Sequence, residues 1–368
     1  MDKSIITEAL AKLYTSFGYA QYRMEKFEEY DLYSRHKEFL SSGSVLTFTD
    51  TNGKLMALKP DVTLSIVKNS DVKTGVRRVY YSENVYRVAG GTGTYREIPQ
   101  VGLEALGDLD DCTTAEVIEL AARSLKTISG SGSALDVSHL GLISAAMEAV
   151  GINDTAAKSN VMALVGGKNM HETAYACRSY GADEGKIPSF CALMETEGDV
   201  GDADVEKRIR SLCGELGIGG AADELLRILS AIGVKENEKN NVRVDFSCVG
   251  DTRYYNSFVY SGYVRGVPGS VLSGGCYDGL MARMGKKARG IGFAVYVDML
   301  DAISDVSVND SDAVLIYGGD DEIAAVLAAA DRIRAGGLSV TVCRERDAAD
   351  VRARRRYRMR GLTTEEMV

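Results

Sequence analysis

Residues 83–104 constrain the fold most, because two runs of β-forming residues flank a glycine-rich loop. This pattern predicts a long β-hairpin. Side chains alternate between the two faces of a strand, so Gln100, Gly102 and Glu104 fall on one face. Two hydrogen-bonding side chains then flank a residue that has no side chain. We therefore expect a slot for a small polar ligand on the hairpin.

The composition is that of a globular protein whose partners are not polyanions. The 368 residues are 45% hydrophobic and 26% charged, with a formal net charge of -9. Proteins that hold nucleic acid normally carry a basic surface, so this acidic chain predicts no nucleic-acid partner. No segment approaches the length of a membrane span, which predicts no membrane partner.

Cysteine and histidine usage predicts neither a metal site nor a disulfide framework. The seven cysteines are an odd number without a C-x-x-C pair, and the three histidines are isolated. Neither set has the spacing of a zinc site. Free cysteines are typical of a reducing compartment, and the first residues lack the apolar run of a secretory signal. We expect a cytoplasmic protein with no metal and no other cofactor.

The segments before and just after the hairpin predict both helices and strands. Asn52-Gly53 is typical of a tight hairpin turn, and Asp61 is placed to cap a helix. The expected elements are helices over 4–17, 61–68 and 113–128, an edge strand leading into a helix over 22–33, and a hairpin of 45–49 with 55–59.

The rest of the chain predicts a helical insertion, the end of the sheet and a small terminal unit. A short strand is expected at 135–138, and strands at 242–246 and 254–260 complete the sheet. Residues 313–342 predict one β-α-β unit, which is too small to stand alone as a sheet domain. Six arginines lie within 352–360, where we expect a helical or frayed, solvated tail. The helices of the insertion are expected over 140–150, 157–165, 205–216 and 221–232.

Four motifs resemble the core of class II histidyl-tRNA synthetases, and more closely the regulatory subunits of short-form ATP phosphoribosyltransferases. They occur in the family's order within residues 1–300. The first, Leu58–Thr63, is similar to L-R-P-E/D-x-T, and the second, Tyr86-Arg87 with Gln100–Glu104, is similar to F-R and Q-x-G-x-E. The third, Arg253–Tyr260, is similar to the family's Y-Y signature, and the fourth, Gly274–Leu280, is similar to G-G-R-Y-D-x-L.

The resemblance implies an α+β fold with a class II synthetase-like antiparallel sheet flanked by helices, a helical insertion and a truncated carboxyl-terminal β-α-β unit. Four segments follow from it. They are 1–132 and 241–305 as the two parts of the synthetase-like core, 133–240 as a mainly helical insertion, and 312–368 as a β-α-β remnant with a basic tail.

The resemblance also implies a histidine site. In the family, the acid and threonine of the first motif hold the ammonium group, the glutamine and glutamate of the second face the amino acid, and a tyrosine of the third holds the imidazole. The matching positions, with the first arginine and the tyrosine of the fourth motif, are Asp61, Thr63, Arg87, Gln100, Glu104, Tyr255 and Tyr277. Gly274 and Gly275 would form the backbone of a ligand turn.

Each motif also has a purely structural interpretation. Asp61 and Thr63 could cap a helix, and Arg87 and Glu104 could be an exposed pair on neighbouring strands. The third motif could be a packed aromatic strand, and the paired glycines a tight turn.

Several departures from the family pattern concern the positive side chains around ATP. Arg87 matches one family arginine, but Gly250, Cys276, Met299 and Thr94 occupy positions where the family has arginine. The loss of one preorganised donor typically costs about 10² to 10³ in rate. The resemblance therefore implies that the amino-acid pocket is retained and the ATP pocket is lost.

On this basis we expect a non-catalytic regulatory subunit of short-form ATP phosphoribosyltransferase. It would bind histidine, associate with the catalytic subunit as a homodimer within a hetero-oligomer, and provide feedback regulation of the first step of histidine biosynthesis. One alternative is a divergent histidyl-tRNA synthetase-like enzyme that still activates an amino acid. Another is a binding module that has lost histidine as its ligand.

Overall fold

The computed structural model describes residues 3–40, 45–71, 74–88, 93–129, 132–233, 241–303, 311–349 and 351–367. Residues 3–302 form one compact unit, and residues 303–368 belong to a second, smaller unit.

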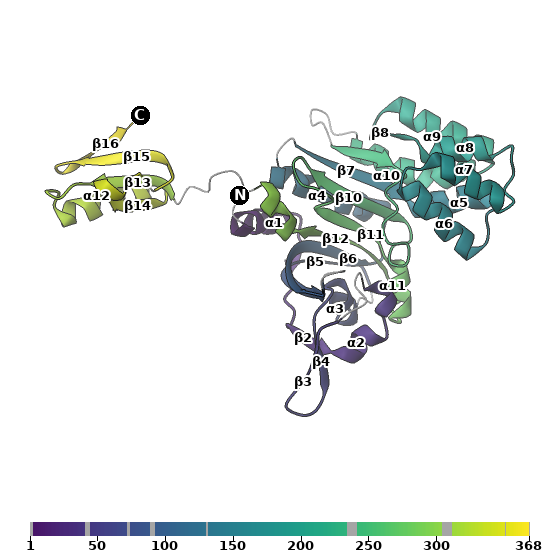
Figure 1. Cartoon of the computed structure of the whole chain (residues 1–368), viewed down its shortest axis with the longest axis horizontal. Coiled ribbons are helices and arrows are strands. Elements are labelled where there is room, and N and C mark those ends of the chain that lie inside the picture. Colours follow the sequence, from purple (N-terminus) through teal and green to yellow (C-terminus); the bar gives the residue numbers. More distant parts are fainter. Residues whose placement is uncertain are drawn as a thin grey trace. The chain divides into compact units, whose positions relative to one another are not determined.

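A nine-stranded sheet is the centre of the larger unit (Figure 1). Most neighbours are antiparallel, and only the pairs β1–β5 and β7–β9 are parallel. The prediction of an α+β fold with a large antiparallel sheet is confirmed. In spatial order the strands are Ala20–Gln21 (β1), Val76–Val88 (β5), Tyr95–Gly107 (β6), Arg289–Tyr296 (β12), Leu272–Cys276 (β11), Phe258–Val264 (β10), Ser133–His139 (β7), Val242–Asp245 (β9) and Glu197–Asp199 (β8).

The strands β5 and β6 form the long hairpin that the sequence predicts. Tyr81 lies opposite Gly102, and Val79 lies opposite Glu104. The predicted glycine-rich turn lies partly in residues 89–92, outside the described residues. The hairpin lies near one edge of the sheet, where β5 pairs with the two-residue edge strand β1 and β6 pairs with β12.

Two helices, Lys3–Ser16 (α1) and Asp111–Ser129 (α4), cover one face of this sheet. Helix α1 buries Ile6, Leu10 and Tyr14, which follow helical spacing. The Tyr14 hydroxyl bonds with Ser124 Oγ of α4 at 3.0 Å. The helices predicted over 4–17 and 113–128 are confirmed, and the opposite face of the sheet is left to form the site.

A small three-stranded sheet precedes the long hairpin. It contains Phe27–Glu29 (β2), Leu55–Leu58 (β4) and Thr47–Thr49 (β3), in that spatial order. Gly53 has a φ of 81°, which explains the Asn-Gly turn between β3 and β4. The helices Tyr30–Ser34 (α2) and Thr63–Lys68 (α3) complete this region, as the sequence predicts.

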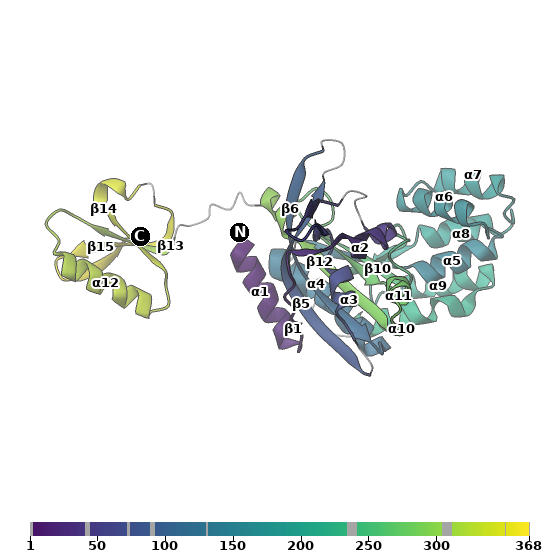
Figure 2. The same cartoon turned by 90° about the horizontal axis from the view of Figure 1, so that it is seen from below.

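The segment between β7 and β10 is mostly helical and gathers at one side of the sheet, away from α1 (Figure 2). Four of its helices match the predicted positions, whereas α7 and α8 were not predicted. Strand β7 is longer than the predicted strand and pairs with β10 along its whole length. The helices are Leu140–Ala149 (α5), Thr155–Gly166 (α6), Met170–Ser179 (α7), Ile187–Met194 (α8), Ala203–Leu216 (α9) and Asp223–Gly233 (α10).

The smaller unit is a four-stranded sheet with one helix. Its strands are ordered Val340–Arg344 (β14), Ser311–Tyr317 (β13), Ala353–Arg360 (β15) and Thr363–Met367 (β16), and the helix is Ile323–Ala335 (α12). The predicted β-α-β unit is therefore extended by two strands.

The prediction of a helical or frayed segment at 352–360 is wrong. These residues form β15, which is parallel to β13 and antiparallel to β16. Met359 is buried and Tyr357 packs with it in the core under α12. The arginines are accommodated because Arg358 and Arg360 pair with Glu345 and Glu365 at 2.6 and 2.8 Å.

Candidate functional site

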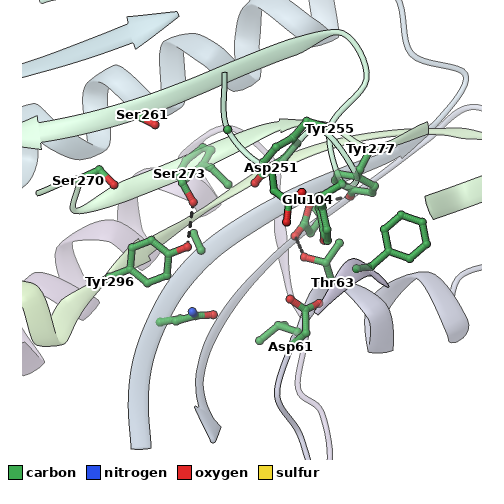
Figure 3. A pocket seen from close by; sticks show the side chains of 18 of the residues that line it. Asp61, Thr63, Glu104, Asp251, Tyr255, Ser261, Ser270, Ser273, Tyr277 and Tyr296 are labelled. Carbon is green, nitrogen blue, oxygen red and sulfur yellow. Dashed lines mark hydrogen bonds between the residues drawn. The ribbon is translucent and has the colours of Figure 1, made fainter. Parts of the chain in front are cut away.

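A cavity of about 320 Å³ opens on the face of the nine-stranded sheet opposite α1 and α4. Its volume is at the lower end of the range of about 300 to 1,000 Å³ that is typical of small-molecule sites. Figure 3 shows side chains that converge on it from α3, β6, β12 and the loop before β10. The structure brings together all seven side chains that the sequence singled out, namely Asp61, Thr63, Arg87, Gln100, Glu104, Tyr255 and Tyr277.

Glu104 is the most constrained side chain of the cavity. It is 1% exposed, and its two carboxyl oxygens accept hydrogen bonds from Thr63 Oγ1 and from the Tyr277 hydroxyl, each at 2.6 Å. Burial raises the pKa of Glu104 to about 8, although these two hydroxyl donors act in the opposite direction. The exposed strand pair considered for Arg87 and Glu104 is therefore wrong for Glu104. Such a carboxyl group is arranged to receive a hydrogen-bond donor or a cation from a ligand.

Asp61 both caps a helix and lines the cavity. Its Oδ1 accepts from the backbone N–H of Leu64 at 2.9 Å, so it does cap α3. It also lines the cavity (Figure 3). Burial raises the pKa of this carboxyl, while the Leu64 N–H and the Arg87 guanidinium act against the rise. The cap fixes the carboxylate in place, and the open side of the cavity leaves it accessible to a ligand.

Arg87 is the one basic side chain among the described residues that line the cavity. Its Nε donates to the carbonyl oxygen of Pro60 at 3.0 Å, which ties β5 to the segment carrying Asp61. A third carboxylate, Asp251, is already paired with Arg253 at 2.7 Å. Because the lining contains the carboxyl groups of Asp61 and Glu104 and a single arginine, the cavity favours a ligand with cationic or N–H donor groups.

Aromatic rings form the walls. Tyr254 packs edge-on against Tyr255 and Tyr277, with ring centroids 4.9 and 6.0 Å apart. Burial and neighbouring carboxylates raise the pKa values of Tyr81, Tyr254, Tyr255 and Tyr277 well above the usual one. These phenols stay neutral at physiological pH and provide O–H groups without charge.

The prediction of a slot at Gly102 is wrong. A Cβ atom at this position would lie 2.5 Å from the Tyr81 hydroxyl and 2.2 Å from the carbonyl oxygen of Phe293. Tyr81 is the cross-strand neighbour of Gly102 and covers it. The open space lies instead beside Glu104. There Gly292, the β12 partner of Glu104, leaves room for its carboxyl group, since a Cβ would lie 1.7 Å from Oε2.

The prediction that Gly274 and Gly275 form a ligand turn is also wrong. Both lie within the strand β11, and neither lines the cavity. A Cβ on Gly274 would lie 2.4 Å from the carbonyl oxygen of Gly292, and one on Gly275 would lie 2.6 Å from the Tyr255 ring. The two glycines therefore make room for the neighbouring strand and for a tyrosine of the wall.

The sequence reasoning missed the hydroxyl-rich end of the cavity. Ser261, Ser270, Ser273 and Tyr296 line it, and Ser273 Oγ bonds with the Tyr296 hydroxyl at 2.8 Å (Figure 3). Alternation within β10, β11 and β12 was the available signal, but it becomes informative only once the order of the strands is known.

Over the described ranges of the chain, no group of three or more metal-ligating side chains could hold a metal ion. In the same ranges no helix is both long and apolar enough to cross a membrane.

The family model described as histidyl-tRNA synthetase matches residues 3–300. Curated relatives named "ATP phosphoribosyltransferase regulatory subunit" include proteins of Oceanobacillus iheyensis and Symbiobacterium thermophilum. The first is 23% identical over 82% of this chain and 73% of its own length. The second is 29% identical over 80% of this chain and 75% of its own length.

Solved structures share the fold. A Bacillus halodurans protein described as an ATP phosphoribosyltransferase regulatory subunit/histidyl-tRNA synthetase gives a TM-score of 0.71 at 21% identity, covering 94% of this chain and 89% of that one. The histidyl-tRNA synthetase of a Nostoc species gives a TM-score of 0.76 at 15% identity, covering 100% and 93%.

Proposed function

This chain belongs to the histidyl-tRNA synthetase family, and from that premise we propose that it is a non-catalytic regulatory subunit of a short-form ATP phosphoribosyltransferase. In this role it binds histidine, associates with the catalytic subunit in the cytoplasm, and makes the first step of histidine biosynthesis responsive to histidine. The regulatory subunits named among its relatives support the role.

The observation that carries the ligand assignment is the buried Glu104 carboxyl held by Thr63 and Tyr277. In this proposal Glu104 accepts a further hydrogen bond from an imidazole N–H, and an amino acid without such a donor forgoes that bond, which favours histidine. Asp61 faces the α-ammonium group from the other side. Arg87, Gln100 and Tyr255 complete the contacts with the ligand.

The non-catalytic assignment is supported by the position where the family pattern has its signature arginine. Gly250 has a φ of 54°, and a Cβ there would lie 2.6 Å from Val259 Cγ2 and 3.2 Å from the Tyr255 ring. A side chain here would be strained and would have to displace Val259 or the Tyr255 ring, which disfavours an arginine at this position. We infer that the site lacks one of the positive charges that the family pattern supplies for adenylate formation.

Feedback requires more than binding. Histidine must bind the inhibited state of the complex more tightly than the active state, since equal affinity shifts no equilibrium. By analogy with class II synthetases, we propose that the chain acts as a homodimer within a hetero-oligomer.

The test is reconstitution with a short catalytic subunit from the same source. The rate of the ATP and phosphoribosyl-pyrophosphate reaction is measured with and without this chain across a histidine titration. We expect the rate to rise on addition of the chain and to fall with histidine.

Glu104→Ala should abolish the response to histidine, and Glu97→Ala serves as the matched control on the same strand, since Glu97 is exposed. A chain that leaves the rate unchanged contradicts the proposal. Histidine-dependent pyrophosphate exchange would then favour the divergent amino-acid-activating enzyme.

A further inference from the structure

The loop before β10 carries Tyr254 and Tyr255, which form one wall of the cavity. The backbone N–H groups of both tyrosines donate to the carbonyl oxygen of Asp251 at 2.9 Å, so the loop is internally compact. Its placement on the sheet depends on how its end at Asn256 is attached.

Asn256 is bonded to the junction between β11 and the helix Asp278–Arg283 (α11). Its backbone N–H donates to the carbonyl oxygen of Cys276 at 3.0 Å. Its side-chain Oδ1 accepts from the backbone N–H of Asp278 at 2.7 Å, and its Nδ2 donates to Asp278 Oδ2 at 3.4 Å. Both ends of the amide group are therefore directed at one residue.

Asp278 is in turn fixed to β12. Its Oδ1 accepts from the backbone N–H of Gly290 at 3.0 Å, and its Oδ2 accepts from Arg289 Nε at 3.1 Å. Asp278 also follows Tyr277 directly, and Tyr277 bonds with Glu104 at 2.6 Å. Neither Asn256 nor Asp278 lines the cavity itself.

We propose that Asn256 and Asp278 are a pair of positioning residues that hold Tyr254 and Tyr255 against Tyr277 in the wall of the cavity. The pair links the loop of the third motif to the strand-helix junction of the fourth. Its effect on a ligand rests on the proposed histidine site, whereas its effect on the loop does not.

The spacing of the tyrosine ring and its neighbours explains why small displacements of the loop matter. The Tyr255 ring lies between Gly250 and Gly275, where added Cβ atoms would approach it to 3.2 and 2.6 Å. The Tyr255 ring therefore fits closely between the backbones of Gly250 and Gly275. When the bonds between Asn256 and Asp278 are lost, we expect the ring to move out of this position.

The first experiment follows the loop directly by hydrogen exchange and mass spectrometry on the full chain. In Asn256→Ala we expect the amides of residues 251–256 to exchange roughly 10-fold faster, as for the loss of one or two hydrogen bonds. Asn160→Ala is the matched control, because Asn160 is also exposed and bonds with one side chain, the Tyr180 hydroxyl, at 3.0 Å. Unchanged exchange over 251–256 in a folded Asn256→Ala variant would overturn the proposal.

A reciprocal exchange of the two side chains distinguishes positioning from general destabilisation. Asn256→Asp places two carboxylates together, and Asp278→Asn places two amide groups with donors facing each other. The double variant restores one donor and one acceptor. We expect both single variants to weaken histidine binding about 10-fold. The double variant should recover part of this loss but not all of it, because an amide at position 278 no longer offers acceptors to both Gly290 and Arg289.

The exchange and binding results separate the two proposals. If the parent chain does not bind histidine, the proposed function is wrong, and the protection of residues 251–256 still decides the role of the pair. If the double variant is no better than the single variants in both assays, the pairing itself is wrong.

Discussion

Replacement of Glu104 by glutamine tests the electrostatic account of the site. In the folded chain, burial raises the pKa of Glu104 to about 8 from an ordinary value of 4.5. A carboxyl whose pKa is higher in the folded state favours folding below the unfolded-state pKa, and this advantage is lost as the pH rises through the folded-state pKa. The empty protein therefore becomes less stable between about pH 4.5 and pH 8 because of this one group.

The size of the effect follows from the two pKa values. A difference of about 3.5 corresponds to about 5 kcal/mol of folding free energy, fully expressed only above pH 8. Glutamine cannot ionise, so Glu104→Gln should lose this pH dependence. Its amide places a donor towards Thr63 Oγ1 or the Tyr277 hydroxyl, which costs about 1 to 3 kcal/mol at every pH.

Chemical denaturation from pH 5 to pH 9 measures the outcome. At pH 5 the parent chain should have the higher free energy of unfolding. As the pH rises to about 8, this difference should shrink and then change sign, so that Glu104→Gln becomes the more stable chain. Glu97→Gln is the control, because Glu97 is exposed and the pKa of its carboxyl is lowered by Asn84 and Tyr86. A stability difference between the parent and Glu104→Gln that stays constant from pH 5 to pH 9 would refute the reasoning.

Two further substitutions test neighbouring parts of the site. Gly250→Arg should lower the melting temperature and produce no histidine-dependent pyrophosphate exchange, because the new Cβ meets Val259 and the Tyr255 ring; measurable exchange would contradict this. Tyr277→Phe removes a donor that lowers the pKa of Glu104 in the folded state, so the decline in stability should begin at the same pH as in the parent chain and extend to a higher pH. Histidine binding measured by calorimetry should weaken about 10-fold.

Local patterns were sufficient to predict much of the fold. The long hairpin, the Asn-Gly turn and helices α1 and α4 depend on alternation, turn residues and apolar spacing within a few residues of each other. The strand β15 was missed because its five arginines, together with Arg352 before it, suggested a solvated tail. Its strand conformation depends on pairing with β13 and β16, which lie on either side of it in space and not in local sequence.

Motif matches identified seven side chains of the cavity. The errors in the prediction concern contacts between neighbouring strands, which the sequence does not show. Gly102 was expected to open a slot, but its neighbour Tyr81 belongs to another strand and fills it. His139 shows the same limit. It is isolated in sequence, yet its ring accepts from the Leu142 N–H at 3.0 Å and bonds with Ser257 and Glu224 at 3.1 and 3.2 Å.

A cavity that lowers the stability of the folded chain while it is empty suits a subunit whose proposed role is to respond to ligand binding. Above pH 8, Glu104 alone weakens the empty state by up to about 5 kcal/mol, and a bound N–H donor or cation recovers part of that energy. Moving a two-state equilibrium from 1:99 to 99:1 takes a difference in binding free energy of about 5.5 kcal/mol. Glu104 can supply part of that difference if only one state of the complex lets the ligand reach both Asp61 and Glu104. A synthetase uses such binding energy for the reaction of its substrate, whereas in the proposed regulatory role the same energy shifts the equilibrium of a partner.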